Sequence, residues 1–258
     1  MRNPRPLRCL AAVLGLIVAM PVAAQPAPAA PSCSAGTVYL TIDTGWGREA
    51  TQIAEILKRR NVRATLFIAN EPTFNGERSL SPAWADFWRA RVAEGHVFAS
   101  HTDRHWYFRG DAGPGRTRYV SRGREGQAVL DQAAMCRELN EPIERLRAIA
   151  PGATVLPLWR APGGITTPGA IQMAQACGLR HQGWTAHGFL GDELSSEASP
   201  NRALATRALN TVRDGEVLVM HWGIRSRQDP YANVLDEVIA GLQARGFCFA
   251  TLPPDGRR

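Results

Sequence analysis

Apolar runs that suit strands alternate along the chain with stretches whose apolar residues recur at helical spacing. Strand-like runs are expected at 37–43, 62–68, 96–100, 155–159, 179–185, 216–221 and 247–252. Helical patterns are expected at 49–60, 82–94, 125–148, 168–177, 201–213 and 232–245. Strands that alternate with helices at this spacing are typical of βα units and a parallel sheet. About seven such units predict an α/β fold, a TIM-like barrel in a single domain.

The first 24 residues have the pattern of an export signal. Three arginines precede an apolar run over residues 10–20, and a small-residue cleavage site, Val-Ala-Ala, ends at residue 24. An uncleaved anchor helix is the alternative, but the run is short for a membrane span. We therefore expect residues 1–24 to be a signal peptide, 25–36 a Pro/Ala-rich linker and 37–254 the folded domain. The protein would be periplasmic or secreted.

Export changes what the cysteines predict. Four cysteines remain after residue 24, an even number in an oxidising compartment: Cys33, Cys136, Cys177 and Cys248. Of the three possible pairings we favour Cys33–Cys248 with Cys136–Cys177, because the first bond would join the start of the domain to its last strand. The sequence has no C-x-x-C, so a thiolate zinc site has no support.

Composition excludes several classes of protein. The chain is 45% hydrophobic and 21% charged, which is unlike disordered, collagen-like or coiled-coil sequences. Its formal net charge is +7, of which the export signal carries three positive charges. The remaining bias is too mild for a nucleic-acid footprint. We expect no nucleic acid as partner, no membrane span after signal cleavage, and a monomer.

Ionisable side chains follow several of the predicted strands. Asp43 ends the first strand, His101 and His105 follow the third, Arg160 follows the fourth and His221 ends the sixth. In a barrel these strand ends meet at one rim, where the chemistry of such folds occurs. Two histidines four apart would face one way on a helical turn and could hold one metal ion. A carboxylate could then accept a proton from water while another histidine protonates the leaving group.

These segments resemble, in order, the motifs of the polysaccharide deacetylases (carbohydrate esterase family four). Residues 41–45, TIDTG, resemble T-F-D-D-G, and residues 101–105, HTDRH, match H-[S/T]-x-x-H. Residues 160–164, RAPGG, match R-x-P-[Y/F]-G apart from the aromatic, and residues 218–221, LVMH, match L-x-[M/L]-H. The family includes chitin and chitooligosaccharide deacetylases, peptidoglycan N-deacetylases and acetylxylan esterases. The resemblance spans about residues 37–252.

The resemblance implies a distorted (β/α)7 barrel and metal-dependent hydrolysis of N-acetyl groups on an aminosugar polymer, peptidoglycan or chitin-like. Carried over by position, Asp43 is the general base and His221 the general acid. Arg160 would orient Asp43, and the backbone N–H of Gly163 would help to hold the oxyanion.

One departure from the family concerns the metal. His101 and His105 are the implied ligands of a divalent ion, for which Zn²⁺ is expected, but the family's third ligand, an aspartate, is Thr44 here. A neutral hydroxyl is a poor ligand beside a carboxylate, so the ion would be held more weakly or would need another donor.

A second departure lies in the aspartate-rich fourth motif. His187 occupies its first aspartate position, where we expect a satisfied loop histidine rather than a ligand. Asp192 could supply a carboxylate partner for Arg160; alternatively Arg160 pairs only with Asp43. These departures leave two alternatives to the N-deacetylase, a non-catalytic carbohydrate-binding protein on the same barrel and an O-acetyl esterase.

Aromatic and basic residues suggest how a glycan would be held. Trp46, Trp106 and Trp222 lie near motif residues, and we expect them to form a floor on which sugar rings stack. Three other tryptophans are expected in the core: Trp84, Trp88 and Trp159. The arginines of the segment 104–124 (Arg109, Arg116 and Arg118) are expected on a solvated, glycine-rich loop, with an anionic-glycan subsite as the alternative.

Overall fold

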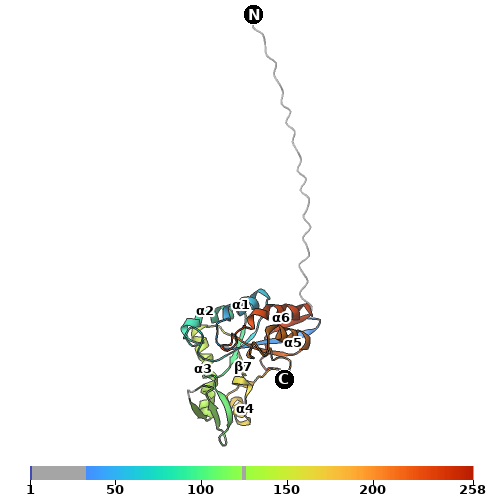
Figure 1. Ribbon diagram of the computed structural model, residues 1–258. Coiled ribbons are helices and arrows are strands. Elements are labelled where there is room, and N and C mark those ends of the chain that lie inside the picture. The colour runs from blue at the N-terminus through green and yellow to red at the C-terminus, as the bar shows by residue number, and fades with distance from the viewer. Residues whose placement is uncertain (2–32, 124–125, 258) are drawn as a thin grey trace. The chain divides into compact units, whose positions relative to one another are not determined.

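Seven parallel strands form the main sheet of the computed structural model, which describes residues 1, 33–123 and 126–257 (Figure 1). Their order is β10-β1-β2-β3-β7-β8, with β9 also paired to β1. The strands are β1 (Gly36–Asp43), β2 (Thr65–Ile68), β3 (Val97–Ser100), β7 (Val155–Trp159), β8 (Arg180–His181), β9 (Val217–His221) and β10 (Phe247–Ala250). Residues 2–24 of the predicted signal peptide and residues 25–32 of the predicted linker lie outside the described residues.

Helices cover this sheet as the alternating pattern predicts. α5 packs against α6, α6 against α1, α2 against α3 and α3 against α4. Their bounds are α1 (Ala50–Arg59), α2 (Ala85–Ala93), α3 (Gln132–Ile149), α4 (Pro168–Ala176), α5 (Asn201–Thr211) and α6 (Ala232–Ala244), with two short 3₁₀ turns, η1 (Pro82–Trp84) and η2 (Pro162–Gly164). The side chains on both faces of the central strands are covered, as is typical of a parallel sheet. β2 is buried throughout, and β1 is buried over its last four residues.

The barrel is distorted on the side of β8. This strand has only two residues, and in the described part of the chain a single parallel bridge, from Phe189 to Val219, joins the segment after β8 to β9. The fold predicted from the sequence, a distorted (β/α)7 TIM-like barrel in one domain, is confirmed.

A second sheet in residues 107–130 was not predicted. β4 (Tyr107–Asp111), β5 (Thr117–Val120) and β6 (Gln127–Leu130) pair antiparallel. The helix expected to begin at residue 125 begins at Gln132 instead, because Asp131 caps it by accepting the backbone N–H of Ala134 at 2.8 Å. The glycine-rich loop expected around residues 110–115 is the turn between β4 and β5.

Two disulfides join distant parts of the domain, and both pairings favoured from the sequence are confirmed. Cys33 bonds to Cys248, which ties the segment before β1 to β10 across 215 residues. Cys136 bonds to Cys177, which ties α3 to the end of α4. Such bonds are typical of proteins that leave the reducing cytosol. No helix in the described residues is both long and apolar enough to span a bilayer.

Candidate active site

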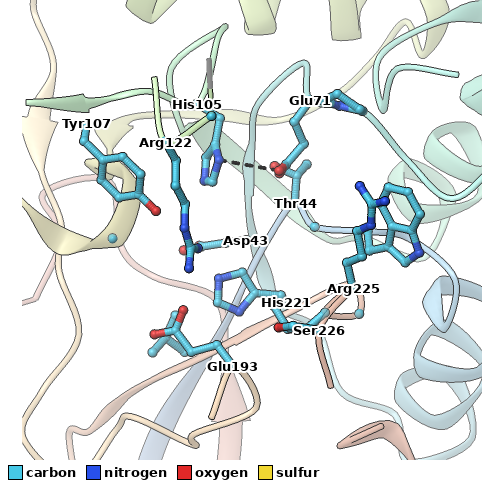
Figure 2. Close-up of a pocket in the computed structure, with 18 of the residues that line it drawn as sticks. Asp43, Thr44, Glu71, His105, Tyr107, Arg122, Glu193, His221, Arg225 and Ser226 are labelled. Carbon is cyan, nitrogen blue, oxygen red and sulfur yellow. Dashed lines mark ion pairs between the residues drawn. The ribbon is translucent and has the colours of Figure 1, made fainter. Parts of the chain in front are cut away.

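The carboxyl ends of the parallel strands surround a cleft of about 720 Å³ (Figure 2). Asp43 reaches it from the end of β1 and His221 from the end of β9, and His105 lies in the loop after β3. Asp43 and His221 are register partners in the β1–β9 pair, so the two side chains lie at one level of the sheet. Further lining residues are Thr44, Trp46, Glu71, Tyr107, Arg122, Gly163, Trp184, Phe189, Glu193 and Arg225.

A buried arginine holds the carboxylate of Asp43. Arg160 Nη1 donates to Asp43 Oδ1 at 2.7 Å, and the guanidinium also donates to the hydroxyl of Thr41 and to the carbonyls of Gln182 and Gly183. Arg160 is fully buried, so its hydrogen bonds fix both its own position and that of the carboxylate. Of the two interpretations of Arg160, pairing with Asp43 alone is the one that the structure bears out.

The surroundings of Asp43 keep it ionised. Burial by itself would raise the pKa of this carboxyl, but Arg160, His101 and His221 outweigh it and hold the pKa below its ordinary value. Asp43 is therefore a carboxylate at neutral pH, the form that can accept a proton.

His101 and His105 bring their rings together, although not on the helical turn that their spacing suggested. Thr102 and His105 instead have left-handed backbone, with φ of 67° and 57°. The two Nε2 atoms lie 3.2 Å apart. His101 Nδ1 lies 2.9 Å from the carbonyl of Arg160, which can only accept, so the proton is on Nδ1 and the lone pair is on Nε2. Burial lowers the pKa of His101 to about 3, which keeps the ring neutral.

The loop that carries both histidines is fixed by α3. Glu138 accepts the backbone N–H of Arg104 at 2.7 Å and its Nε at 2.8 Å, and it also accepts the hydroxyl of Tyr119. The Tyr119 hydroxyl in turn accepts the backbone N–H of Trp106 at 3.0 Å. His105 thus lies between two residues whose backbone is held, which sets its ring in the cleft.

The two imidazoles fit a divalent ion. Two Nε2 lone pairs that share a tetrahedral Zn²⁺ at about 2.0–2.1 Å would lie roughly 3.3 Å apart, close to the separation of His101 and His105. Among the described residues, however, no group of three or more His, Cys, Asp or Glu side chains is arranged to hold an ion. Thr44 Oγ1 accepts the backbone N–H of Ala69 at 3.1 Å, so the hydroxyl that replaces the family's aspartate is already engaged.

Asp192 pairs with His221 rather than with Arg160, which corrects one of the alternatives drawn from the sequence. Asp192 Oδ2 lies 3.1 Å from His221 Nδ1 and accepts the backbone N–H of His221 at 2.7 Å. Burial would lower the pKa of His221, but Asp192, Asp43 and Glu193 together raise it to about 9. His221 is therefore protonated at neutral pH, with Nε2 left to face the cleft.

Gly163 lies in the cleft wall with a left-handed φ of 62°. A Cβ built at this residue would lie 2.6 Å from Cε1 of Tyr107, so the ring of Tyr107 occupies the space beside it. The family has an aromatic at this motif position. Here a ring from β4 lies against the glycine instead, and sequence spacing could not have identified it.

Two of the three tryptophans expected to form a sugar floor lie elsewhere. Trp222 is 2% exposed and packs edge-to-face against Phe87 and Trp88, so that prediction is wrong. It comes directly after His221, the last residue of β9, and its side chain points the opposite way, into the helix layer that holds Phe87 and Trp88. Trp106 is half-buried under Arg104 and against Tyr119, outside the cleft.

Trp46 is in the cleft wall, as the sequence predicted. Trp184 and Phe189 also line the cleft, and their rings stack with centroids 6.4 Å apart. These residues precede β9 in the eroded fourth motif, whose first residue is Trp184, and neither was predicted to contact sugar. The three tryptophans expected in the core are buried as predicted: Trp84, Trp88 and Trp159.

Several residues for which the sequence left a role in the site as the alternative lie outside the cleft, as expected. His187 is exposed and lies 3.2 Å from Glu216, away from the cleft. The three arginines expected on a solvated loop are exposed on the β4–β5 hairpin and do not line the cleft: Arg109, Arg116 and Arg118. The arginines that do line it, Arg122 and Arg225, were not singled out from the sequence.

Solved structures share this fold. A family 4 carbohydrate esterase from Streptomyces lividans, in complex with acetate, has a TM-score of 0.62 at 21% identity, over 86% of this chain and 96% of that one. A CE4 family pseudoenzyme from Bacillus anthracis has the same TM-score at 18% identity, over 84% of this chain and 64% of that one. The fold therefore occurs in both active and inactive proteins.

Sequence comparison places the chain in a family. A chitooligosaccharide deacetylase from Azorhizobium caulinodans is 23% identical over 228 residues, which are 84% of this chain and 93% of that protein. The sequence profile of the polysaccharide deacetylases matches residues 31–181, more than half of the chain. The chain therefore belongs to the polysaccharide deacetylase family.

Proposed function

We propose that the protein is an exported, metal-dependent deacetylase that hydrolyses N-acetyl groups of an aminosugar polymer, peptidoglycan or chitin-like. The observation that carries this proposal is the pairing of opposite charge states in one cleft. Asp43 and His221 are register partners, and their surroundings hold one as a carboxylate and the other as an imidazolium. Amide hydrolysis needs such a base and such an acid on either side of one carbonyl group.

In the proposed reaction Asp43 takes a proton from the attacking water. The water oxygen forms a bond to the acetyl carbon while His221 gives its Nε2 proton to the amide nitrogen. The C–N bond then breaks, and acetate and a free amine are the products. Arg160 keeps the Asp43 carboxylate in place, and the backbone N–H of Gly163 is proposed to hold the developing oxyanion.

His101 and His105 are the proposed ligands of a divalent metal, Zn²⁺ first among the candidates. When bound, such an ion polarises the acetyl carbonyl and lowers the pKa of water. The neutral state of His101 and the 3.2 Å separation of the two Nε2 atoms support this assignment. Thr44 has no charge to offer the ion, so we do not keep it among the strong ligands.

Export is part of the proposal, with residues 1–24 as signal peptide, 25–36 as linker and 37–254 as the catalytic domain. The two disulfides support a periplasmic or secreted location, because thiols stay reduced in the cytosol.

A second function, carbohydrate binding without hydrolysis, is favoured by the loss of the third ligand at Thr44. The two functions differ in one measurement, acetate release by the chain from Gln25 onward. The substrates are N-acetylglucosamine oligomers, peptidoglycan and acetylated xylan, each with added zinc and after chelation. We expect zinc-dependent release from an N-acetylated polymer, and release from xylan alone would identify an O-acetyl esterase.

Two variants complete this experiment. Asp43→Asn should abolish release while leaving sugar binding, and His105→Ala should lose both zinc and turnover with the fold intact. If no substrate releases acetate and the wild-type protein binds no zinc, the binding protein replaces the enzyme. Retained activity in His105→Ala would contradict the ligand assignment.

A further inference from the structure

Glu71 is a half-buried carboxylate in the cleft wall with no assigned role. It follows β2 and lies beside Thr44 and His105 in Figure 2. Its Oε2 is 3.5 Å from Nδ1 of His105. Its other oxygen, Oε1, is buried and has no hydrogen-bond partner among the described residues. A carboxylate oxygen held out of water without a donor is costly, so its position calls for a partner.

The backbone around Glu71 is fixed on both sides. Its N–H donates to the hydroxyl of Ser79 at 3.1 Å, and its carbonyl accepts the N–H of Ser79 at 2.9 Å. The preceding N–H, of Asn70, donates to the carbonyl of Asp103 at 2.9 Å, which ties this loop to the loop of His105. The two loops that carry Glu71 and His105 are therefore held together by the main chain.

The contact has a chemical consequence for His105. A carboxylate can only accept, so it favours the proton of His105 on Nδ1 and leaves the lone pair on Nε2. That Nε2 is the atom 3.2 Å from the Nε2 of His101. Metal-binding histidines commonly donate their second N–H to a carboxylate, which fixes the tautomer and raises the basicity of the ligand.

We propose that Glu71 is the positioning residue of His105 and supplies the metal centre with the carboxylate that Thr44 cannot. It acts through the His105 ring, holding the tautomer and orientation in which both Nε2 lone pairs converge. This inference rests on the proposed function, because it takes His101 and His105 as the ligands. It explains how the site can hold an ion although the family's aspartate is absent.

The test measures zinc affinity by titration calorimetry on the oxidised chain from Gln25 onward. Glu71→Gln keeps the shape and removes the charge, and we expect zinc affinity to fall about 10–100-fold. Glu77→Gln is the matched control, because Glu77 is exposed in the same loop and does not line the cleft. It should bind zinc as the wild type does. Melting temperatures of both variants confirm that the fold is kept.

Nitrogen NMR of the histidine rings gives the readout that a purely structural role would not move. In the zinc-free wild type we expect His105 to be protonated on Nδ1, and in Glu71→Gln we expect a mixture of tautomers. Unchanged zinc affinity in Glu71→Gln, or weakened affinity with an unchanged His105 tautomer, overturns the inference. If either of these outcomes is found while the wild type binds zinc and releases acetate, the role of Glu71 is wrong but the proposed function stands.

A different observation concerns the charge of the substrate. Arg122, which follows β5, and Arg225, which follows β9, both line the cleft and lie on either side of His221 in Figure 2. Neither is paired with a carboxylate in the described part of the chain. The guanidinium of Arg225 lies over the ring of Trp46, 4.6 Å from its centroid. The stacking holds this cation at the wall where the sequence predicted sugar binding.

The acidic residues that line the cleft face groups other than Arg122 and Arg225. Asp43 is bonded to Arg160, Glu71 faces His105, and Glu193 contributes to the charge of His221. Two arginines thus remain for a ligand, and a guanidinium binds a carboxylate with two parallel hydrogen bonds. We infer that the substrate is an acidic glycan, an aminosugar polymer that carries a carboxylate beside the acetylated sugar. This inference also rests on the proposed function.

The test compares acetate release from two substrates of equal length. One is a glycan strand with the lactyl carboxylate of muramic acid, and the other is the same strand with that carboxylate amidated. We expect the wild type to have a KM about tenfold lower for the acidic strand. The double variant Arg122→Gln/Arg225→Gln should lose most of this preference, whereas Arg116→Gln, on the exposed hairpin, should keep it.

Equal KM values for the two strands in the wild type, or a preference kept by the double variant, overturn the acidic substrate while the deacetylase remains. Absence of release from both strands and from neutral oligomers instead contradicts the proposed function.

Discussion

Nδ1 of His221 lies 3.1 Å from Oδ2 of Asp192, and the same oxygen accepts the backbone N–H of His221 at 2.7 Å. The carboxylate therefore fixes both the ring and the strand end that carries it. It also stabilises the imidazolium, so that the proton intended for the leaving amine is present before substrate binds. His221 depends on a residue 29 positions earlier, in the segment that bridges to β9.

The first prediction follows from this pair. In Asp192→Asn the pKa of His221 should fall from about 9 toward its ordinary value near 6.5. At pH 8 only about 3% of the histidine would then stay protonated, so kcat should fall roughly thirtyfold. The measurement is the pH profile of kcat, whose alkaline limb should move to lower pH. Asp255→Asn, at an exposed position, is the control, and an unmoved limb in Asp192→Asn would contradict the role of the pair.

The same pair makes folding stability depend on pH. The pKa of His221 is raised in the folded state, so its contribution is fully present below about pH 6.5 and is lost as the pH rises through about 9. The difference of pKa corresponds to about 3 kcal/mol. Urea unfolding at pH 6 and pH 10 should show a smaller difference of stability in Asp192→Asn than in the wild type.

A second prediction concerns the buried ion pair of Arg160 and Asp43. Arg160→Met removes the partner and leaves the carboxylate uncompensated, which should cost about 3–5 kcal/mol of stability. Because Arg160 is the strongest of the groups that lower the pKa of Asp43, this pKa should rise when Arg160 is removed, and the acid limb of kcat/KM should move to higher pH. In the wild type the pKa of Asp43 is lower in the folded state than in the unfolded state. The ion pair therefore stabilises the fold at pH values above the unfolded-state pKa, and this stabilisation is lost as the pH falls through the folded-state pKa.

Arg160→Lys separates charge from geometry in this experiment. It keeps the cation beside Asp43 but cannot reproduce the fork that also reaches Gln182 and Gly183. We expect intermediate stability and an acid limb near that of the wild type. If Arg160→Met shows no displacement of the acid limb, Asp43 is not the base whose protonation limits the rate.

A third prediction separates two tryptophans that look alike in the sequence. Trp46→Ala should raise KM about tenfold with little change in stability, because Trp46 is half-buried and faces the cleft. Trp222→Ala should instead cost about 3–5 kcal/mol of stability, since the ring is 2% exposed against Phe87 and Trp88. Denaturant unfolding and steady-state kinetics on both variants measure the two effects. A raised KM without loss of stability in Trp222→Ala would mean that Trp222 contacts sugar after all.

The contrast between these tryptophans shows what the sequence could predict. Strand ends were predictable, because apolar runs and helical periodicity mark the βα units and parallel strands deliver their last residues to one rim. Asp43 and His221 were found in this way. The predicted strand 216–221 ends where β9 ends, but the sequence does not show that the alternation of side chains continues into the next residue, Trp222.

Contacts between loops were not predictable from spacing. Glu71 and Tyr107 reach the cleft from segments with no recognised motif. A backbone hydrogen bond to Ser79 holds Glu71, and the ring of Tyr107 lies against Gly163; only the folded chain makes these contacts. The antiparallel sheet of β4, β5 and β6 was missed because the apolar residues of 127–130 continue into the helical pattern of α3. Asp131 was the available signal, as an N-cap at the true start of the helix.

The last prediction compares the two disulfides. Cys33–Cys248 closes a segment with a sequence separation of 215, and Cys136–Cys177 one with a separation of 41. Restricting the unfolded chain stabilises the folded state more for the longer segment, by about 1.5 kcal/mol on the chain-entropy relation. We expect Cys33→Ser/Cys248→Ser to lose more stability than Cys136→Ser/Cys177→Ser, within the 2–5 kcal/mol typical of such bonds. Urea unfolding of both double variants measures the difference, and the opposite order would mean that local packing around α3 and α4 outweighs the entropy of the chain.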